Sequence, residues 1–223
     1  MESPKKEAPP ERAAFFVDGN NWFKNLNKAG VFNLGQLNYL KVSQKLLDGR
    51  IWAGTKYCIG RVKNTGNPDL YNEQQRYLGW LANRDKRLTI HFGRIEERIA
   101  DNDMAKDLKA FLSNLSVRGI KIDLGVYKSL WAIAERHEHP RVYVEKAVDV
   151  MIAVSMVEMA QRNLYDIAFL LSADGDYTPA VVAVKSKGKR VIAVAPSHGG
   201  ALARVVDEYM HLKKEWFEDC FGD

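Results

Sequence analysis

Residues 167–180 read Ile-Ala-Phe-Leu-Leu-Ser-Ala-Asp-Gly-Asp-Tyr-Thr-Pro-Ala. The unbroken apolar run 167–171 is typical of a strand buried on both faces, as in a parallel sheet. Thr178-Pro179 suits the N-cap and first position of a helix. Asp174 and Asp176 are therefore expected on a strand-to-helix turn, at the sheet edge where α/β proteins bind ligands. Two neighbouring acids favour a bound cation, although an acidic turn that caps its helix explains the pattern equally well.

A second apolar run near the start of the chain also ends in a carboxylate. Residues 13–17 read Ala-Ala-Phe-Phe-Val, and Asp18-Gly-Asn-Asn follows before a helix-compatible stretch that extends to Lys28. The order of strand, acid and helix is thus the same as in the first stretch. Since the carboxyl ends of parallel strands meet at one edge, the sequence predicts that Asp18 and Asp174 lie close together.

A third acid, Asp149, opens the apolar run 146–160. Its neighbours one and two helical turns on are apolar, which predicts that Asp149 lies on the buried stripe of its helix. An unpaired charge is costly there, so a shared metal site explains the three acids together. Taken alone, Asp149 is also explained by a favourable position in the first helical turn or by an ion pair with Lys146.

Length and composition indicate one α/β domain over residues 13–223 behind a flexible, proline-rich tail at 1–12. The net charge of +5 permits a polyanionic partner without establishing one. Cys58 and Cys220 match no zinc spacing, and no membrane-spanning run or signal peptide is present, so we expect a cytoplasmic protein.

The remaining elements follow from periodicity, caps and turn residues. We expect further strands at 51–60, 88–92, 120–126 and 190–195. Helices are expected after Asn33, at 68–86 with Asn67 as cap, and at 103–118, 178–187 and 201–209. Residues 93–102 indicate a surface loop, and residues 128–144 a looped insertion. Alternating strands and helices predict a Rossmann-like three-layer α/β/α sandwich with a mainly parallel sheet.

Three of these segments, in order and rough spacing, resemble the motifs of NYN domains of the LabA-like group, in the PIN-like nuclease superfamily. They are Phe16-Val-Asp-Gly-Asn-Asn21, Lys146-Ala-Val-Asp149 and Leu171-Ser-Ala-Asp-Gly-Asp-Tyr-Thr-Pro179, and the closing 201–209 also resembles the end of such domains. The resemblance covers about residues 13–212. Ala173 and Tyr177 stand where the family more often has Gly and Phe.

The resemblance implies a metal-dependent endoribonuclease with Mg²⁺ or Mn²⁺ in an acidic pocket. The matched acids, which would be both catalytic and metal-binding, are Asp18, Asp149, Asp174 and Asp176. Substrate-binding roles fall to Asn21, Lys146, Ser172 and Tyr177. The expected partner is single-stranded RNA, with homo-oligomerisation left open.

Carboxylate oxygens suit Mg²⁺ or Mn²⁺, and such an ion would activate a water for attack on a phosphodiester. For RNA contacts we consider Lys24 and Lys28 after the first acidic turn, and the basic stretch 185–190. Two other functions remain open: a non-catalytic RNA-binding or regulatory protein with the same fold, and a phosphohydrolase that acts on small molecules.

Overall fold

The computed structural model describes residues 9–62, 64, 68–115 and 118–222. Contacts divide the chain into an α/β unit, which comprises Met1–Arg94 and Lys146–Asp223, and a hairpin unit, Ile95–Glu145. Most of the tail predicted at 1–12, and the cap predicted at Asn67, lie outside the described residues.

A seven-stranded sheet is the centre of the fold, with the strand order β4-β3-β2-β1-β5-β6-β7. The pairings β1–β2, β1–β5, β2–β3, β5–β6 and β6–β7 are all parallel. The bounds are β1 Arg12–Asp18, β2 Ile51–Gly60, β3 Leu88–Ile99, β4 Arg141–Lys146, β5 Ile167–Leu171, β6 Arg190–Ala195 and β7 Glu208–His211. The chain order runs outward from β1 in both directions, so the topological switch point lies between β1 and β5.

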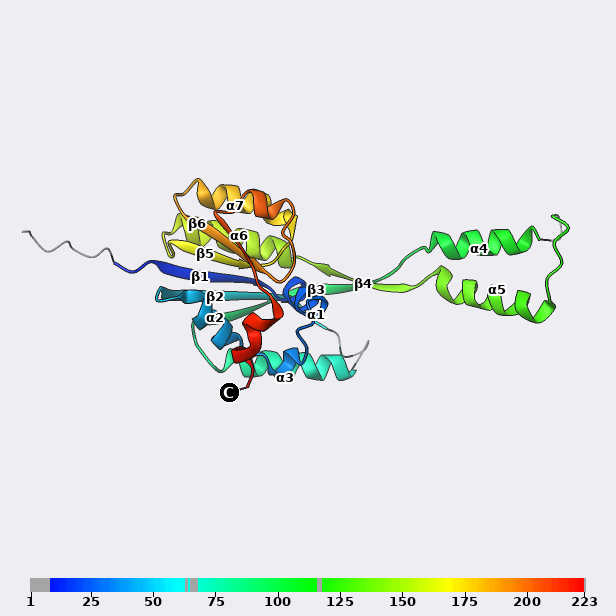
Figure 1. The fold of residues 1–223 in the computed structure, drawn as a ribbon, viewed down its shortest axis with the longest axis horizontal. Coiled ribbons are helices and arrows are strands. Elements are labelled where there is room, and N and C mark those ends of the chain that lie inside the picture. Colours follow the sequence, from blue (N-terminus) through cyan, green and yellow to red (C-terminus); the bar gives the residue numbers. More distant parts are fainter. Residues whose placement is uncertain (1–8, 63, 65–67, 116–117, 223) are drawn as a thin grey trace, which may run out of the picture. The chain divides into compact units, whose positions relative to one another are not determined.

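Helices cover both faces of this sheet (Figure 1), and a hydrophobic core lies between the sheet and each layer of helices. Alternate residues of β1 and β5 point into opposite cores; Phe15 and Phe169 belong to one, and Phe16 and Leu170 to the other. The first core contains α1 Gly19–Lys28, α2 Tyr39–Leu47, α3 Pro68–Ala82 and the 3₁₀ helix η4 Lys214–Cys220; the second contains α6 Val148–Gln161 and α7 Thr178–Lys185. The predicted three-layer α/β/α sandwich is therefore confirmed. No helix in the described part of the chain combines the length and apolarity needed to cross a membrane.

The hairpin unit contains two helices, α4 Asp103–Ser113 and α5 Leu124–Glu138, together with the end of β3 and most of β4. The strand expected at 120–126, the loop at 93–102 and the looped insertion at 128–144 are therefore wrong. Asn102 and Asp123 explain the helices, because each side chain accepts a hydrogen bond from a backbone amide of the first turn that follows it.

Three smaller expectations also differ from the structure. The second helix is capped by Asn38, whose side chain accepts from the amides of Leu40 and Lys41, and not by Asn33. Thr178 is the first residue of α7 and makes no capping bond. The helix expected at 201–209 is replaced by a short 3₁₀ turn, η3 Leu202–Arg204, and by β7.

Candidate functional site

Asp18 ends β1 and is 3% exposed. Its Oδ1 accepts a hydrogen bond from the Asn21 amide at 3.0 Å, so the carboxylate caps α1. Gly19 allows this helix to begin close to β2, because an added Cβ would lie 2.9–3.0 Å from Tyr57, the Cys58 carbonyl and Ile59. The predicted strand, acid and helix at the start of the chain thus place a buried carboxylate at the switch point.

The second acidic turn follows β5 and satisfies much of its own hydrogen bonding. The buried Ser172 hydroxyl accepts from the Asp174 amide at 3.2 Å, and Asp174 Oδ1 accepts from the Asp176 amide at 3.0 Å. Asp174 therefore caps the 3₁₀ turn η2 Gly175–Tyr177, while Asp176 is exposed. These bonds agree with the capping interpretation of the turn and leave the outer oxygens of both acids available to solvent.

Asn21 joins the two turns. Its Oδ1 accepts from the Ala173 amide at 3.2 Å and from the Asn25 side chain at 2.6 Å. In the β1–β5 register Val17 lies opposite Leu171, so the two acidic turns leave the sheet at the same level. Asn21, predicted to bind substrate, therefore also fixes the spacing between the two turns.

Asp149 lies in the first turn of α6 and is exposed, so the prediction of a buried side chain is wrong. The buried stripe of α6 begins one residue earlier and consists of Val148, Ile152, Met156 and Ala160. Asp149 keeps the helical spacing of this stripe but lies in the first turn of α6, where its side chain is exposed and its charge reaches water without the expected burial cost.

The backbone before Asp149 is tightly constrained. Ala147 has φ 73°, a left-handed conformation that costs a non-glycine residue about 1 kcal/mol or more. On the neighbouring strand, a Cβ at Gly93 would lie 2.5 Å from Val148 and 2.7 Å from the Lys146 carbonyl oxygen. Gly93 therefore lets β3 contact the segment that orients Asp149.

Tyr177 connects the first and third acids. Its ring is 1% exposed, and its hydroxyl lies 3.0 Å from Asp18 Oδ2 and 3.1 Å from Asp149 Oδ1. The two carboxylate oxygens are thus at most about 6 Å apart, because both contact one atom. Burial, followed by the charges of Asp18 and Asp149, raises the pKa of Tyr177, so the phenol keeps its proton at neutral pH.

The bridging role of Tyr177 was not anticipated from the sequence, which assigned this residue to substrate. Its buried ring offers no face to a base, whereas Phe23 on α1 is 51% exposed. One feature of the sequence could have indicated this bridge: position 177 has Tyr where the family more often has Phe. A buried phenol requires a hydrogen-bond partner, which Phe does not. Lys146 is half-buried at the end of β4, before the α6 segment.

The carboxylates of this site can be compared with the ligands that a divalent metal ion requires. Among the described residues, no group of three or more His, Cys, Asp or Glu side chains is arranged to hold an ion. Mg²⁺, however, is usually bound by one or two carboxylates and keeps several waters, which substrate phosphate can replace. Asp18 and Asp149, brought together at Tyr177, meet that requirement, whereas a closed cage of four carboxylates is not formed.

The basic stretch 185–190 does not accompany the acids. Lys185 pairs with Asp207 at 3.0 Å, and Lys189 pairs with Asp166 at 3.4 Å. Arg190 pairs with Glu11 at 2.7 Å and begins β6, so it lies at the sheet edge opposite the acidic turns. Lys24 and Lys28 are exposed on α1, directly after Asp18, and remain the better candidates for contacts with phosphate.

Tyr177→Phe tests the bridge. We expect the free energy of unfolding of the metal-free protein to fall by about 1–2 kcal/mol, because a buried hydrogen bond to a carboxylate is lost. We also expect Mn²⁺ to bind several-fold more tightly, since a cation then relieves more repulsion between Asp18 and Asp149. Denaturation in EDTA and calorimetric titration with Mn²⁺ measure the two effects.

Tyr165→Phe is the matched control. The Tyr165 ring is fully buried, and its hydroxyl donates to the Met156 carbonyl at 2.7 Å, away from the acids. This variant should lose stability and keep its Mn²⁺ affinity. Weaker Mn²⁺ binding by Tyr177→Phe would contradict the prediction, because the hydroxyl would then be a group that orients the acids for the ion.

Comparison with known proteins places the chain in a family. No curated protein matches the sequence. A crystal structure of a protein of unknown function from Vibrio parahaemolyticus has a similar fold, with a TM-score of 0.50 and 14% identity over 94% of this chain and 95% of that chain. The family model of the NYN domain matches residues 12–213. NYN domains are generally nucleases with a PIN-like fold and typically use divalent metals. Because the match covers nearly the whole sequence, the chain belongs to the NYN domain family.

Proposed function

We propose that this chain is a metal-dependent endoribonuclease of the LabA-like group, with its active site at the acidic edge between β1 and β5. The observation that carries the proposal is the Tyr177 hydroxyl, which lies within 3.1 Å of carboxylates from two separate motifs. A topological switch point is where α/β folds bind ligands, and oxygen ligands there suit Mg²⁺ or Mn²⁺. Family membership independently supports a nuclease.

The residues divide the work by their position relative to Tyr177. Asp18, fixed by the Asn21 amide and Tyr177, and Asp149 at the start of α6 would hold the cation. Asp174 and Asp176, on the adjoining turn, would position waters of its outer shell. The bound cation supplies an activated water and neutralises charge on the phosphate oxygens. Asn21 and Ser172 keep the turns in place, while Lys146, Lys24 and Lys28 would contact the RNA backbone.

A cleavage assay tests the proposal directly. End-labelled single-stranded RNA should be cut internally by the purified chain with Mn²⁺ or Mg²⁺, and cutting should stop with EDTA. Duplex RNA and a panel of nucleotides serve as comparison substrates. Binding of RNA without fragments under any metal would favour the non-catalytic alternative, and turnover of nucleotides alone would favour a small-molecule phosphohydrolase.

A further inference from the structure

The hairpin unit has a second apolar stripe that its own two helices do not cover. Between the helices, Ala105 and Leu112 of α4 and Ala134 of α5 are buried. Lys109 of α4 closes one end of this contact through an ion pair with Glu138 at 2.5 Å. These residues account for the contact between α4 and α5. Apolar side chains on the other sides of the two helices are therefore not explained by that contact.

The apolar residues of this stripe, which we call the hairpin face, are spaced four and then three residues apart on both helices, and the middle residue of each row is half-buried. They are Met104, Leu108 and Phe111 on α4, and Val126, Leu130 and Ile133 on α5. Met104 is 82% exposed, Phe111 45%, and Val126 and Ile133 are each 49% exposed. Spacing of this kind places three residues in one row along a helix.

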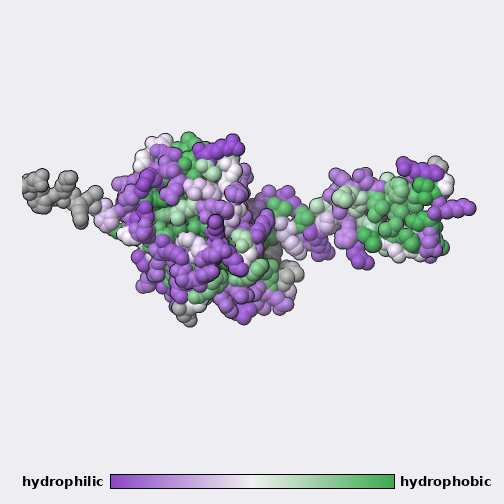
Figure 2. All heavy atoms as spheres, in the orientation of Figure 1, coloured by the Kyte–Doolittle hydropathy of each residue, from purple (hydrophilic) through white to green (hydrophobic). Residues whose placement is uncertain are grey.

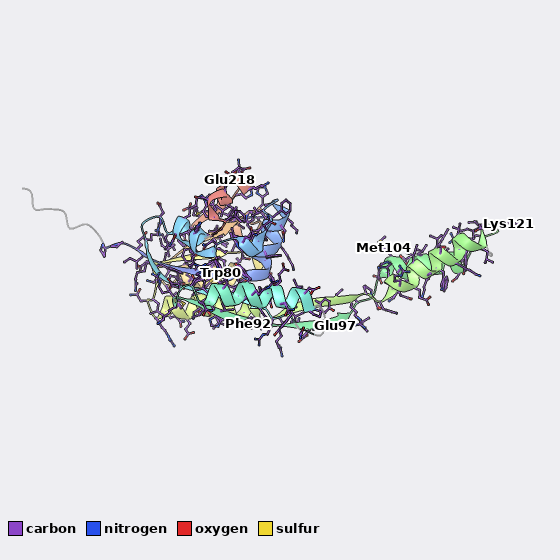
Figure 3. The ribbon with its side chains drawn as sticks, turned by 90° about the horizontal axis from the view of Figure 1, so that it is seen from below. Trp80, Phe92, Glu97, Met104, Lys121 and Glu218 are labelled. Carbon is purple, nitrogen blue, oxygen red and sulfur yellow. The ribbon has the colours of Figure 1, made fainter. Side chains whose placement is uncertain are left out.

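Both rows lie on the same side of the hairpin. On α4, Met104 and Phe111 each precede a buried residue by one position; on α5, Ile133 precedes the buried Ala134 in the same way. The residue one position before a buried residue points about 100° away from it around the helix axis, on α4 as on α5. The two helices run in opposite directions and also bury opposite sides, and these two differences cancel. The preceding residues of both helices therefore point to the same side of the hairpin. Figure 2 shows hydrophobic residues gathered on the surface of this hairpin, between Met104 and the α4–α5 connection around Lys121 that Figure 3 labels.

We propose that the hairpin face binds the same face of a second copy of this chain and forms a four-helix bundle. Paired helices with a one-sided apolar face reach a complete core by this arrangement. The 15 residues of α5 span about 22 Å, and two helices side by side are about 20 Å wide. Packing two such faces together removes on the order of 1,000 Å² of surface in total, which is at the low end for a specific interface.

Charge at the rim fits a two-fold pairing. Asp107 borders the row on α4, and Arg136 borders the row on α5 at the same level of the hairpin, near the Lys109–Glu138 pair. Neither residue has an ion-pair partner among the residues that the structure describes. A two-fold axis along the hairpin places α4 of one copy over α5 of the other, so Asp107 meets Arg136 of the second copy twice.

Sedimentation equilibrium of the full chain at micromolar concentration tests the proposal. The wild type should be a dimer, and Phe111→Lys/Ile133→Lys should weaken self-association on the order of 100-fold or more, because two charges would be buried per copy. Val182→Lys, at a valine of α7 that is 56% exposed, is the matched control and should remain a dimer. Circular dichroism at 222 nm checks that the hairpin variant keeps its helices.

A charge exchange tests the register. Asp107→Arg should weaken the dimer, and the addition of Arg136→Asp should restore it. A wild type that stays monomeric, or a dimer that persists in Phe111→Lys/Ile133→Lys with its helices intact, would overturn the proposal. The inference does not depend on the nuclease proposal, because these measurements use neither RNA nor metal.

Discussion

Asp149→Asn should lower the rate of metal-dependent RNA cleavage by about 100-fold or more and leave the fold intact. Asp149 is one of the two carboxylates that contact Tyr177, so its loss removes half of the charge directly available to a cation there. Asparagine keeps an oxygen that accepts from the phenol. The exposed side chain contributes at most about 1 kcal/mol to the first turn of α6, so the melting temperature should change little.

Asp103→Asn is the control, because Asp103 is also an exposed acid in the first turn of a helix, here α4. It should cleave RNA at the wild-type rate. The measurement is the initial rate on labelled RNA at saturating Mn²⁺, with thermal unfolding as the check on folding. An Asp149→Asn variant as active as the wild type would rule out the assignment of Asp149 to the site.

Asp18→Asn should reduce cleavage to a similar extent and is a sharper test than alanine. Alanine would also remove the cap of α1, at a cost of about 1 kcal/mol, so its effect on activity would combine with a loss of stability. Asparagine preserves the oxygen that accepts from the Asn21 amide, so this variant measures the effect of the lost charge alone.

Phe169→Ala should lower the free energy of unfolding by about 3–5 kcal/mol, the largest loss of stability that we expect from one substitution. Phe169 is 1% exposed and stacks on Phe15 of the neighbouring strand, with ring centroids 5.0 Å apart. Removal of the ring leaves a cavity in the core on one face of β1 and β5, the two strands that carry the acidic turns. Urea denaturation followed by circular dichroism measures the change.

Phe32→Ala supplies the comparison, since this side chain is 63% exposed and should contribute less than about 0.5 kcal/mol. Equal losses from the two variants would contradict the core position of Phe169. Cleavage by Phe169→Ala should also become more sensitive to temperature, because the β1–β5 pairing sets the spacing of the acids.

The central strands and their acids were predictable because the signal is local. β1, β5 and β6 are built on apolar runs with clear ends; Asp18 ends the first of them, and Asp174 follows the second after two residues. Parallel order then places both acids at one edge without knowledge of any side-chain contact.

The remaining features depend on information that is not local. The alternation of Ile120, Ile122 and Leu124 resembles a strand, yet the Asp123 cap begins a helix there. β7 replaces an expected helix because it pairs with β6, and no pattern within its own residues indicates that partner. Asp149 has the spacing of the buried stripe of α6, but it is exposed in the first turn, and periodicity does not show where along a helix burial begins.

The contact between Tyr177 and Asp18 joins residues 159 positions apart. During synthesis the phenol emerges 159 residues after Asp18. A growing chain on the ribosome therefore carries no assembled acidic site. The contact of the phenol with Asp18 and Asp149 therefore forms only after Tyr177 has been synthesised.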